Sequence, residues 1–365
     1  MSSNEVKLIL SGREYYGWTN VQIKVTLESI VRQFNLGMTR KISAHGDDLR
    51  EIQVGEEAKI VIGDDVVVTG FITEVEEEIS ATTHKISVSG SSKTIDLVDC
   101  TIPDGKPLSY NNQTISQSLS TIASYYGVKV VDKVNKGDRV SLEIDSNVKI
   151  KDALSKWMKA NNFLLTDGAD GELVITYCGE GGNSEDSVVF GVNVLTSKRV
   201  NTGESVYSRY VLLGQSKNVL SESGSSSNQL FGLAEHKGGR YRVLVLKQGE
   251  SATQAEMNNR IATFRDIAVA KSSALSYTLR GWRQSKGMLW QANSFVSVWD
   301  EKFGIAGDQY LIASVTFTLN GSGMTAKLDL RSPEAFLNLP EGESNELSKS
   351  LPKNVKVASA GWTQT

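Results

Sequence analysis

The chain has 365 residues, with 39 basic and 42 acidic side chains and therefore a net charge of −3. At about 150 residues per domain, this length predicts two or three domains rather than a single core. The near balance of charge excludes a protein drawn globally onto phosphate or an anionic membrane, and the hydrophobic content of 39% excludes wholesale disorder.

Cysteine content and hydropathy bear on the compartment. Cys100 and Cys178 are too few for a disulfide framework or a zinc cluster, so we expect both to be buried thiols. No apolar run approaches the roughly 18 residues of a membrane span. The short apolar part of the opening MSSNEVKLIL does not predict a signal peptide. We therefore expect no stable membrane insertion.

The first hundred residues are predicted to form a small β-barrel. Apolar and polar residues alternate, as is typical of strands with one buried face, over 21–27, 34–38, 58–62, 66–72, 75–79 and 86–88. Gly63-Asp64-Asp65 predicts a turn that joins two of these strands into a hairpin. Five or six short strands predict a first barrel at residues 1–99.

A mixed α/β domain is predicted at residues 100–185. Thr114 and Gln117 are spaced as a capping box, and the apolar stripe that follows predicts a helix ending at Gly127. Further apolar patterns predict a helix near 150–158 and a hairpin formed by 163–165 and 173–175. This segment therefore combines helices with strands.

Strand patterns return after residue 186 and predict a second β-barrel at residues 186–335. They cover 188–194, 206–213, 241–246 and the segment from Leu275 onward. Thr253 and Glu256 form a second capping box, ahead of a helix whose expected inner face is Ile261, Phe264, Ile267 and Ala268. We expect a loop, strand and helix segment to be inserted in this barrel at about 216–273.

Two segments have compositions typical of mobile chain. Residues 221–228 are rich in serine and glycine and contain no apolar residue, which predicts a mobile loop. Residues 336–365 contain Pro340, Gly342 and Pro352 among many polar residues, so we expect a flexible C-terminal tail.

The residue order of the first hairpin recurs weakly near the C-terminus. Val75 follows Ile72 by three residues, and Val315 follows Ile312 by three. Any two half-buried hairpins share this period of two, so the spacing alone leaves coincidence and repetition open. If the repeat is real, one chain holds two similar barrels with a mixed segment between them.

No catalytic, cofactor-binding or metal-binding residue is predicted, and no cofactor is expected. His45, His84 and His236 have none of the short helical spacings that metal sites use. The consecutive glutamates 76–78 alternate between the two faces of a strand, so neighbours do not flank one glycosidic bond. We expect them on a solvated edge strand.

Three further motifs are incomplete. Asp167, Asp170 and Glu172 hint at a calcium loop, but Ala169 stands where an oxygen ligand is needed, so a turn is the better interpretation. The glycines at 179–182 lack the Lys-Ser/Thr of a phosphate-binding loop. There is no Gly-x-Ser-x-Gly motif for a hydrolase nucleophile.

Two groups of residues point to other functions, one to nucleic-acid binding and one to carbohydrate binding or cleavage. Arg240-Tyr241-Arg242 and Arg280-Gly281-Trp282-Arg283 interleave cations with aromatic rings as single-strand nucleic-acid binders do, but such short runs are more often amphipathic strands. A cell-wall carbohydrate-binding or glycan-cleaving protein is the main alternative function, because exposed Trp18, Trp282 and Trp290 would suit sugar stacking.

The chain resembles the baseplate hub proteins of Mu-like contractile-tailed phages, a family that includes late control protein D and relatives of the N-terminal part of type VI secretion spikes. The resemblance covers nearly the whole chain, and the order of the matching stretches is its most specific feature. These stretches are VKLILSGREYYGWTNVQIKVTLESIVRQFNL, VTGFITEVEEEISATTHKISVSGSSKTIDLVD, KDALSKWMKANNFLLTDGADGELVIT and AGDQYLIASVTFTLNGSGMTAKLDLRSPEAF.

This resemblance implies a mainly β protein with an α+β segment that assembles as a ring-shaped homotrimer. Each subunit would contribute two related barrels, so three chains would present near six-fold symmetry to a hexameric tail tube and three-fold symmetry to a central spike. The implied function is a baseplate hub that forms part of the channel for DNA. The resemblance brings no catalytic residue and no sequence-specific nucleic-acid binding, and it implies a virion protein assembled in the bacterial host cytoplasm.

Overall fold

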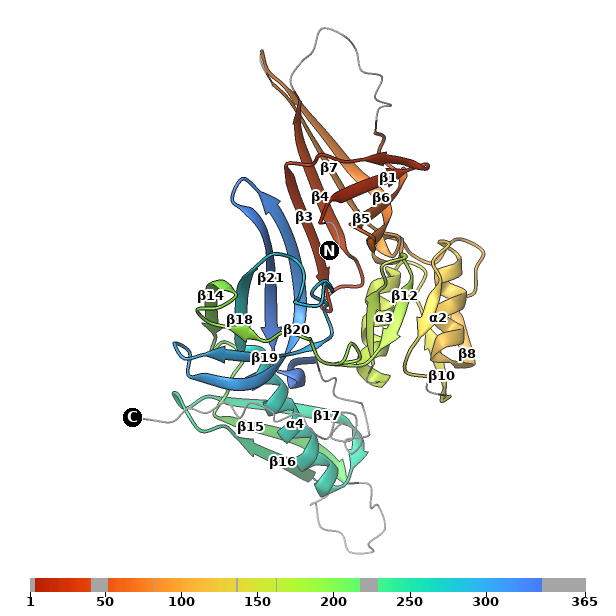
Figure 1. Cartoon of the computed structure of the whole chain (residues 1–365). Coiled ribbons are helices and arrows are strands. Elements are labelled where there is room, and N and C mark those ends of the chain that lie inside the picture. Colours follow the sequence, from red (N-terminus) through yellow and green to blue (C-terminus); the bar gives the residue numbers. More distant parts are fainter. Residues whose placement is uncertain are drawn as a thin grey trace, which may run out of the picture.

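The computed structural model describes residues 4–40, 52–81, 83–135, 137–161, 163–216 and 229–336. The chain is mainly β, and its largest element is one sheet of 13 strands that contains both the N-terminal and the C-terminal strand clusters (Figure 1). The predicted mobile loop at 221–228 and nearly all of the predicted tail at 336–365 lie outside the described residues. In the described part of the chain, no helix is long and apolar enough to cross a membrane.

Seven antiparallel strands form what we call the first module, in the spatial order β2-β1-β5-β6-β7-β4-β3. They are β1 (Val6–Leu10), β2 (Arg13–Tyr15), β3 (Asn20–Thr26), β4 (Gln33–Arg40), β5 (Glu57–Ile62), β6 (Asp65–Ile79) and β7 (His84–Ser92). The predicted hairpin is confirmed: β5 pairs with β6, and the turn between them contains Gly63 with a φ of +63°, a conformation that favours glycine.

Six strands of the second module follow the order β13-β19-β20-β21-β18-β14. They are β13 (Val188–Val189), β14 (Val194–Asn201), β18 (Ser273–Arg280), β19 (Phe295–Asp300), β20 (Ile305–Asn320) and β21 (Gly323–Arg331). This order matches the order β1-β5-β6-β7-β4-β3 of the first module strand for strand. The two modules differ in the direction of one pair: β13 and β19 are parallel, whereas the equivalent strands β1 and β5 are antiparallel. The weak sequence repeat thus corresponds to a shared topology.

The two modules are joined by direct strand pairing, which corrects the expectation of two separate closed barrels. The N-terminal half of β20 pairs with β19, and its C-terminal half pairs with β3 of the first module. The physical reason is strand length: β20 has 16 residues and β19 only 6, so a backbone edge remains for β3. One hydrophobic core runs through both modules and includes Leu8, Ile60, Val315 and Phe317.

The segment between the modules is the α/β domain, which has a separate core. Its elements are α1 (Ile95–Asp99), β8 (Ser109–Thr114), α2 (Ile115–Ser124), β9 (Val130–Asp132), β10 (Arg139–Glu143), α3 (Ile150–Asn161), β11 (Leu164–Asp167) and β12 (Leu173–Thr176). The capping box of Thr114 with Gln117 is confirmed, as is the hairpin, which is formed by β11 and β12. The predicted helix near 150–158 is α3.

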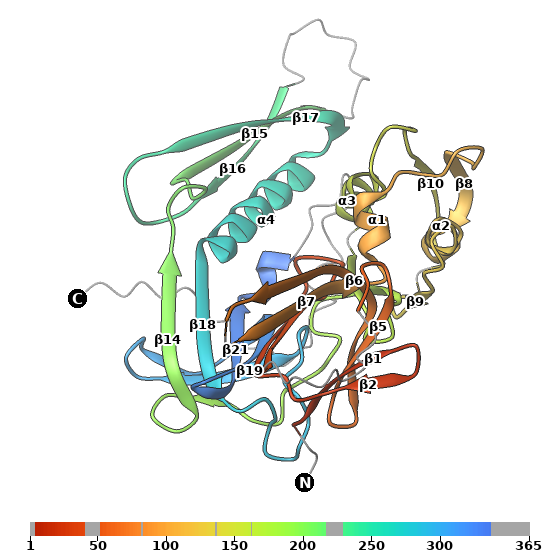
Figure 2. The same ribbon diagram turned by 90° about the horizontal axis from the view of Figure 1, so that it is seen from above.

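An inserted domain separates β14 from β18. Its strands β15 (Arg209–Ser216), β16 (Gln229–Glu235) and β17 (Val243–Ala252) form a sheet of their own, and α4 (Gln254–Ser272) lies across one face of it (Figure 2). The capping box of Thr253 with Glu256 is confirmed. Because β15 pairs with β16 and β17 and with no other described strand, the strand expected at 206–213 lies in this insertion rather than in the second barrel. The 3₁₀-helix η1 (Pro333–Phe336) lies against α4.

Candidate functional site

Histidines and carboxylates do not gather at a metal site in the part of the chain that the structure describes. His84 instead lies 3.3 Å from the Glu77 carboxylate across the β6–β7 hairpin. His45 lies outside the described residues. The glutamates at 76–78 are exposed on the second half of β6, as expected for a solvated edge strand.

Asp167, one of the residues that hint at a calcium loop in the sequence, is a buried partner of Arg32. The Arg32 Nε donates to Asp167 Oδ1 at 3.1 Å, and the Arg32 backbone N–H donates to Oδ2 at 2.8 Å. Burial raises the pKa of the Asp167 carboxyl, and the guanidinium of Arg32 opposes that rise. Arg32 directly precedes β4 and also donates to the carbonyl of Val67 on β6, so its contact with Asp167 connects the first module with the α/β domain. The turn interpretation of 167–172 fits this role.

The tryptophans expected to stack on sugars are buried, so that expectation is wrong. Trp18, Trp282 and Trp290 have exposed fractions of 6%, 0% and 4%. The Trp282 indole N–H donates to the carbonyls of Thr318 and Thr325, and its ring packs edge-on against Phe317. These side chains are large apolar core residues, which their sequence context did not reveal.

The two runs of arginine and aromatic residues make internal contacts. Arg242 lies over the Tyr207 ring at 4.6 Å and donates to the carbonyl of Val206 at 2.9 Å. Arg283 donates to Asp65 and to the carbonyl of Ile62, and so connects the second module to the first. Neither run forms a continuous stacking surface, because these arginines are used within the chain.

Cys100 and Cys178 are both free thiols, but each is partly rather than fully buried. Burial raises the pKa of the Cys178 thiol to about 12, with the Glu334 carboxylate adding to the rise. Such a thiol is almost entirely protonated at neutral pH, and it is therefore a poor nucleophile and a poor metal ligand.

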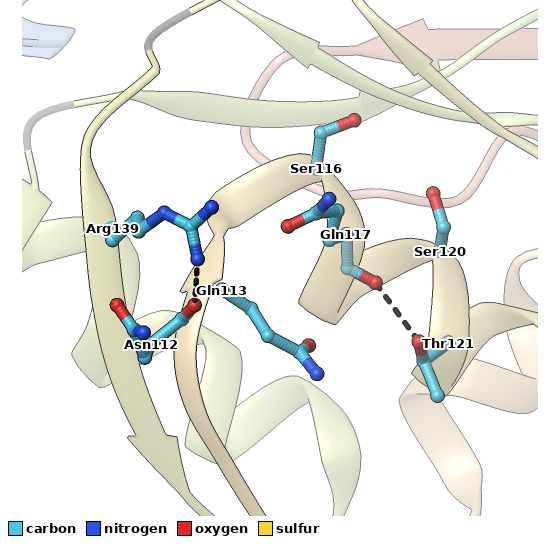
Figure 3. Close-up of a pocket in the computed structure, with 7 residues that line it drawn as sticks. All are labelled: Asn112, Gln113, Ser116, Gln117, Ser120, Thr121 and Arg139. Atoms are coloured by element: carbon cyan, nitrogen blue, oxygen red, sulfur yellow. Dashed lines mark hydrogen bonds between the residues drawn. The ribbon is translucent and has the colours of Figure 1, made fainter.

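A shallow pocket of about 590 Å³ lies on the α/β domain beside α2 (Figure 3). It is lined by neutral polar side chains and one cation: Asn112, Gln113, Ser116, Gln117, Ser120, Thr121 and Arg139. Arg139 donates to the carbonyl of Asn112 at 2.9 Å, and the Thr121 hydroxyl donates to the carbonyl of Gln117 at 3.0 Å. The lining supplies no carboxylate, imidazole or thiol for acid–base or nucleophilic chemistry.

Two unpaired strand edges are the features best suited to a function carried by surfaces. Among the described residues, β6 beyond Ile72 has only β7 as a neighbour, and β14 has only β18. Unpaired edges present free backbone N–H and C=O groups and are ready to pair with another chain. The two edges carry opposite charge, with Glu74 and the glutamates at 76–78 on β6 and Lys198 with Arg199 on β14.

Apolar side chains accompany the β14 edge. Leu195 and Val200 on β14 are 49% and 45% exposed, and Val192 just before it is 81% exposed. A group of exposed large apolar residues beside an open strand is typical of a surface that another protein covers. The run of glutamates in the sequence indicates the acidic edge. Nothing in the sequence indicates that the charges of the β6 edge and the β14 edge are complementary.

Three family models match separate parts of the chain, and together they cover more than half of it. Residues 5–92 match the N-terminal domain of Mu phage baseplate assembly protein GpP-like proteins, and residues 94–177 match the second domain of baseplate hub protein gp44-like proteins. Residues 253–339 match the fourth domain of Mu phage baseplate assembly protein GpP. The chain belongs to the Mu-like baseplate hub family.

Relatives of this Mu-like hub span almost its full length. It is 27% identical over 353 residues to the baseplate hub protein gp44 of Escherichia phage Mu, covering 92% of this chain and 89% of that protein. The crystal structure of the 43 kDa tail protein of prophage MuSo2 from Shewanella oneidensis matches with a TM-score of 0.80 and 28% identity, over 92% of this chain and 100% of that one.

A protein of a type VI secretion system shares the fold of the Mu-like hub. The E. coli c3393 protein, described as a type VI secretion component with structural similarity to the T4 tail proteins gp27 and gp5, matches with a TM-score of 0.51 and 12% identity. The match covers 89% of this chain and 76% of that protein. At this identity the likeness concerns the fold alone.

Proposed function

We propose that this chain is the structural baseplate hub of a contractile phage or prophage tail, where it joins a hexameric tail tube to a trimeric central spike. Family membership supports the hub, and the full-length match to a protein named as a baseplate hub supports it further. The observation that carries the proposal is the pair of topologically equivalent modules joined in one sheet, with an edge on β6 and an edge on β14 that are unpaired among the described residues.

The ring is a homotrimer in this proposal. Each chain supplies two modules, so three chains supply six, which matches a hexameric tube, while the three-fold axis of the assembly matches a trimeric spike. The contact between copies is heterologous, because the β6 edge and the β14 edge are different surfaces, and such contacts form closed rings when the rotation between copies permits. Successive copies would extend the large sheet around the axis.

The exposed face of this sheet suits a channel for DNA. The strands from β14 to β6 carry one face against the core, and the opposite face combines small polar side chains with charges of both signs. The polar side chains are Gln22, Asn35, Ser87, Ser89, Ser276, Thr278, Thr316 and Thr318, and the charged ones include Lys24, Lys327, Glu74 and Glu76. Because acidic and basic side chains both occur among the hydroxyl and amide groups, this face is not the continuous basic surface that holds phosphate tightly. We place this face toward the axis, where DNA passes once the spike has left.

The proposal also concerns location and chemistry. The hub would be a virion protein of the tail baseplate, assembled in the host cytoplasm, with no membrane-inserted part, no sequence-specific nucleic-acid binding and no enzymatic activity. The alternative of a glycan-binding or glycan-cleaving protein loses its supporting observation, since the three tryptophans that suggested it are core residues.

Electron microscopy of the purified chain tests the hub directly. We expect negative-stain class averages of three-fold rings with an open centre, and native mass spectrometry should give three times the chain mass of 39.8 kDa. Particles with two-fold symmetry, or a monomer at every concentration tested, would overturn the ring. Binding of the rings to the end of purified tail tubes would test the tube contact separately.

A further inference from the structure

The pairing of β20 with β3 provides an internal template for a contact between modules. The C-terminal half of β20 lies antiparallel to β3, with Thr316 opposite Lys24, Phe317 opposite Ile23 and Thr318 opposite Gln22. This contact joins the β20 position of one module to the β3 position of the other. The strand equivalent to β20 is β6 in the first module, and the strand equivalent to β3 is β14 in the second. Both β6 and β14 have an unpaired edge among the described residues.

Strand register identifies the equivalent residues on β6 and β20. Val75 is opposite Val88 on β7, and Val315 is opposite Leu328 on β21. In both strands the register shifts just before this point, after Ile72 in β6 and after Ile312 in β20. The positions therefore correspond one by one, and the glutamates 76, 77 and 78 are equivalent to Thr316, Phe317 and Thr318.

The same reasoning relates β14 to β3. Ile23 is opposite Phe34, which is opposite Gly90 on β7. In the second module, Arg199 is opposite Leu275, which is opposite Leu330 on β21. Gly90 and Leu330 are themselves equivalent, because they lie opposite Ile72 and Ile312. Ile23 thus corresponds to Arg199, Gln22 to Lys198 and Lys24 to Val200.

We propose that β14 of one copy pairs antiparallel with the second half of β6 of the next copy, in the register of β3 with β20. Val200 then lies opposite Glu76, Arg199 opposite Glu77 and Lys198 opposite Glu78. The inference rests on the proposed ring, and it adds the residues that close it. The template is transferred without a shift, and it brings two basic residues opposite two acidic ones.

The charges at the free edges follow from the need to keep a monomer soluble before assembly. Within the chain, the equivalent pair is apolar: Phe317 is 2% exposed and Ile23 is 0% exposed, and chain connectivity keeps them together. At the free edges the same positions are Glu77 and Arg199. Charged side chains on an open strand discourage pairing with unrelated strands, and they favour a partner of opposite charge.

The basic edge lacks a carboxylate partner of its own. Arg199 lies 4.5 Å from the centre of the Phe303 ring and donates to the Phe303 carbonyl at 2.5 Å, and neither Arg199 nor Lys198 forms an ion pair with any described residue. On the acidic edge, Glu77 and Glu78 contact His84 and Lys85 on the exposed hairpin, while Glu74 and Glu76 have no cation within salt-bridge distance among the described residues. Glu76, which lies diagonal to Lys198 in the proposed pairing, therefore keeps a negative charge available to the basic strand.

Engineered disulfides test the register, in the full chain with Cys100→Ser and Cys178→Ala as background. The test variant carries Glu76→Cys and Val200→Cys, and directly opposite strand residues are within the Cα separation that a disulfide allows. We expect a disulfide-linked trimer on a non-reducing gel after mild oxidation. A mixture of the two single-cysteine variants should stop at a dimer.

Two controls keep the test decisive. Thr316→Cys with Lys24→Cys is the same pair at the intrachain contact, so it should oxidise within the monomer and show that the position is reactive. Glu76→Cys with Lys198→Cys is displaced by two residues, and we expect it to cross-link at least about tenfold more slowly because the Cα atoms are further apart.

The outcomes separate this inference from the proposed function. Rings that cross-link through the displaced pair and not through the test pair would overturn the register, and the hub would stand. Rings that cross-link through neither pair would overturn pairing of these edges, and the three-fold hub would again stand. A chain that remains monomeric at every concentration would overturn both.

Discussion

Arg32 and Asp167 form a buried ion pair across the boundary between the first module and the α/β domain, with 3.1 Å between Nε and Oδ1. The Asp167 side chain is completely shielded from solvent, whereas that of Arg32 is 16% exposed. Because Arg32 also donates to the Val67 carbonyl, this single side chain holds two folding units together.

Replacement of Arg32 by alanine should destabilise the protein strongly. It leaves the Asp167 carboxylate buried without a counter-charge, which typically costs about 3–5 kcal/mol. Urea denaturation measures the loss, and Arg13→Ala on the exposed strand β2 is the matched control, with an expected change within about 0.5 kcal/mol. A loss for Arg32→Ala no larger than that of the control would show that the pair does not hold the units together.

Asp329 should make the protein more stable above the normal pKa of aspartate than below it. Burial alone would raise its pKa, but hydrogen bonds from Ser276 and Ser314, together with Lys327, lower the pKa below the ordinary aspartate value of 3.8. A lowered folded-state pKa contributes stability above pH 3.8, and this contribution is lost as the pH falls through the folded-state pKa.

The test is the free energy of unfolding measured from pH 6 down to about pH 2 for the native chain and for Asp329→Asn. We expect the variant to be less stable at pH 6 and to lose less stability on acidification. Parallel pH profiles for the two proteins would contradict the prediction.

Truncation of Trp282 should lower the free energy of unfolding, because it removes a side chain that packs in the core and not one on a surface. The ring is fully buried against Phe317, so Trp282→Ala should cost roughly 3–5 kcal/mol. Trp299→Ala, at a position that is 51% exposed, should cost much less in the monomer. Thermal unfolding followed by circular dichroism distinguishes the two, and equal losses would mean that Trp282 is not the core residue described above.

Reversal of charge at the paired edges should weaken assembly and be rescued by the complementary change. Glu78→Lys or Lys198→Glu alone places like charges opposite each other, and we expect each to weaken self-association about tenfold or more, equal to ~1.4 kcal/mol. The double variant restores attraction and should recover most of the loss. Mass photometry measures the effect, with Glu143→Lys on exposed β10 as the neutral control. Absence of rescue would contradict the assigned pairing.

Cys178 should react slowly with thiol reagents in the folded protein. With its pKa raised to about 12 by burial, only about one thiol in ten thousand is ionised at pH 8. In a Cys100→Ser background, the rate of reaction with a disulfide reagent should rise by orders of magnitude on unfolding in urea. Similar rates in the folded and unfolded protein would contradict the prediction.

Local signals in the sequence predicted local structure. The helix α2 was expected because its capping box and apolar stripe lie within a dozen residues, and the hairpin of β5 with β6 was expected from alternation around Gly63. Both depend on neighbours in the chain, whose effects the sequence displays directly. The family resemblance supplied the hub function, which no local motif indicated.

Long-range pairing could not be predicted in the same way. The junction of β3 with β20 joins residues almost 300 positions apart, and neither strand has a pattern that names its partner. The same limit explains the error about Trp282, because its burial depends on Phe317 and on two carbonyls of distant strands. The pairing proposed for the acidic edge and the basic edge depends on the strand registers of both modules, which the sequence does not display.

The insertion between β14 and β18 makes the two modules of one chain unequal, since nothing of this size interrupts the step from β3 to β4. Around a ring of three copies, modules that carry the inserted domain would alternate with modules that lack it. A six-membered neighbour would therefore meet two kinds of site, and three of its subunits could acquire contacts that the other three lack.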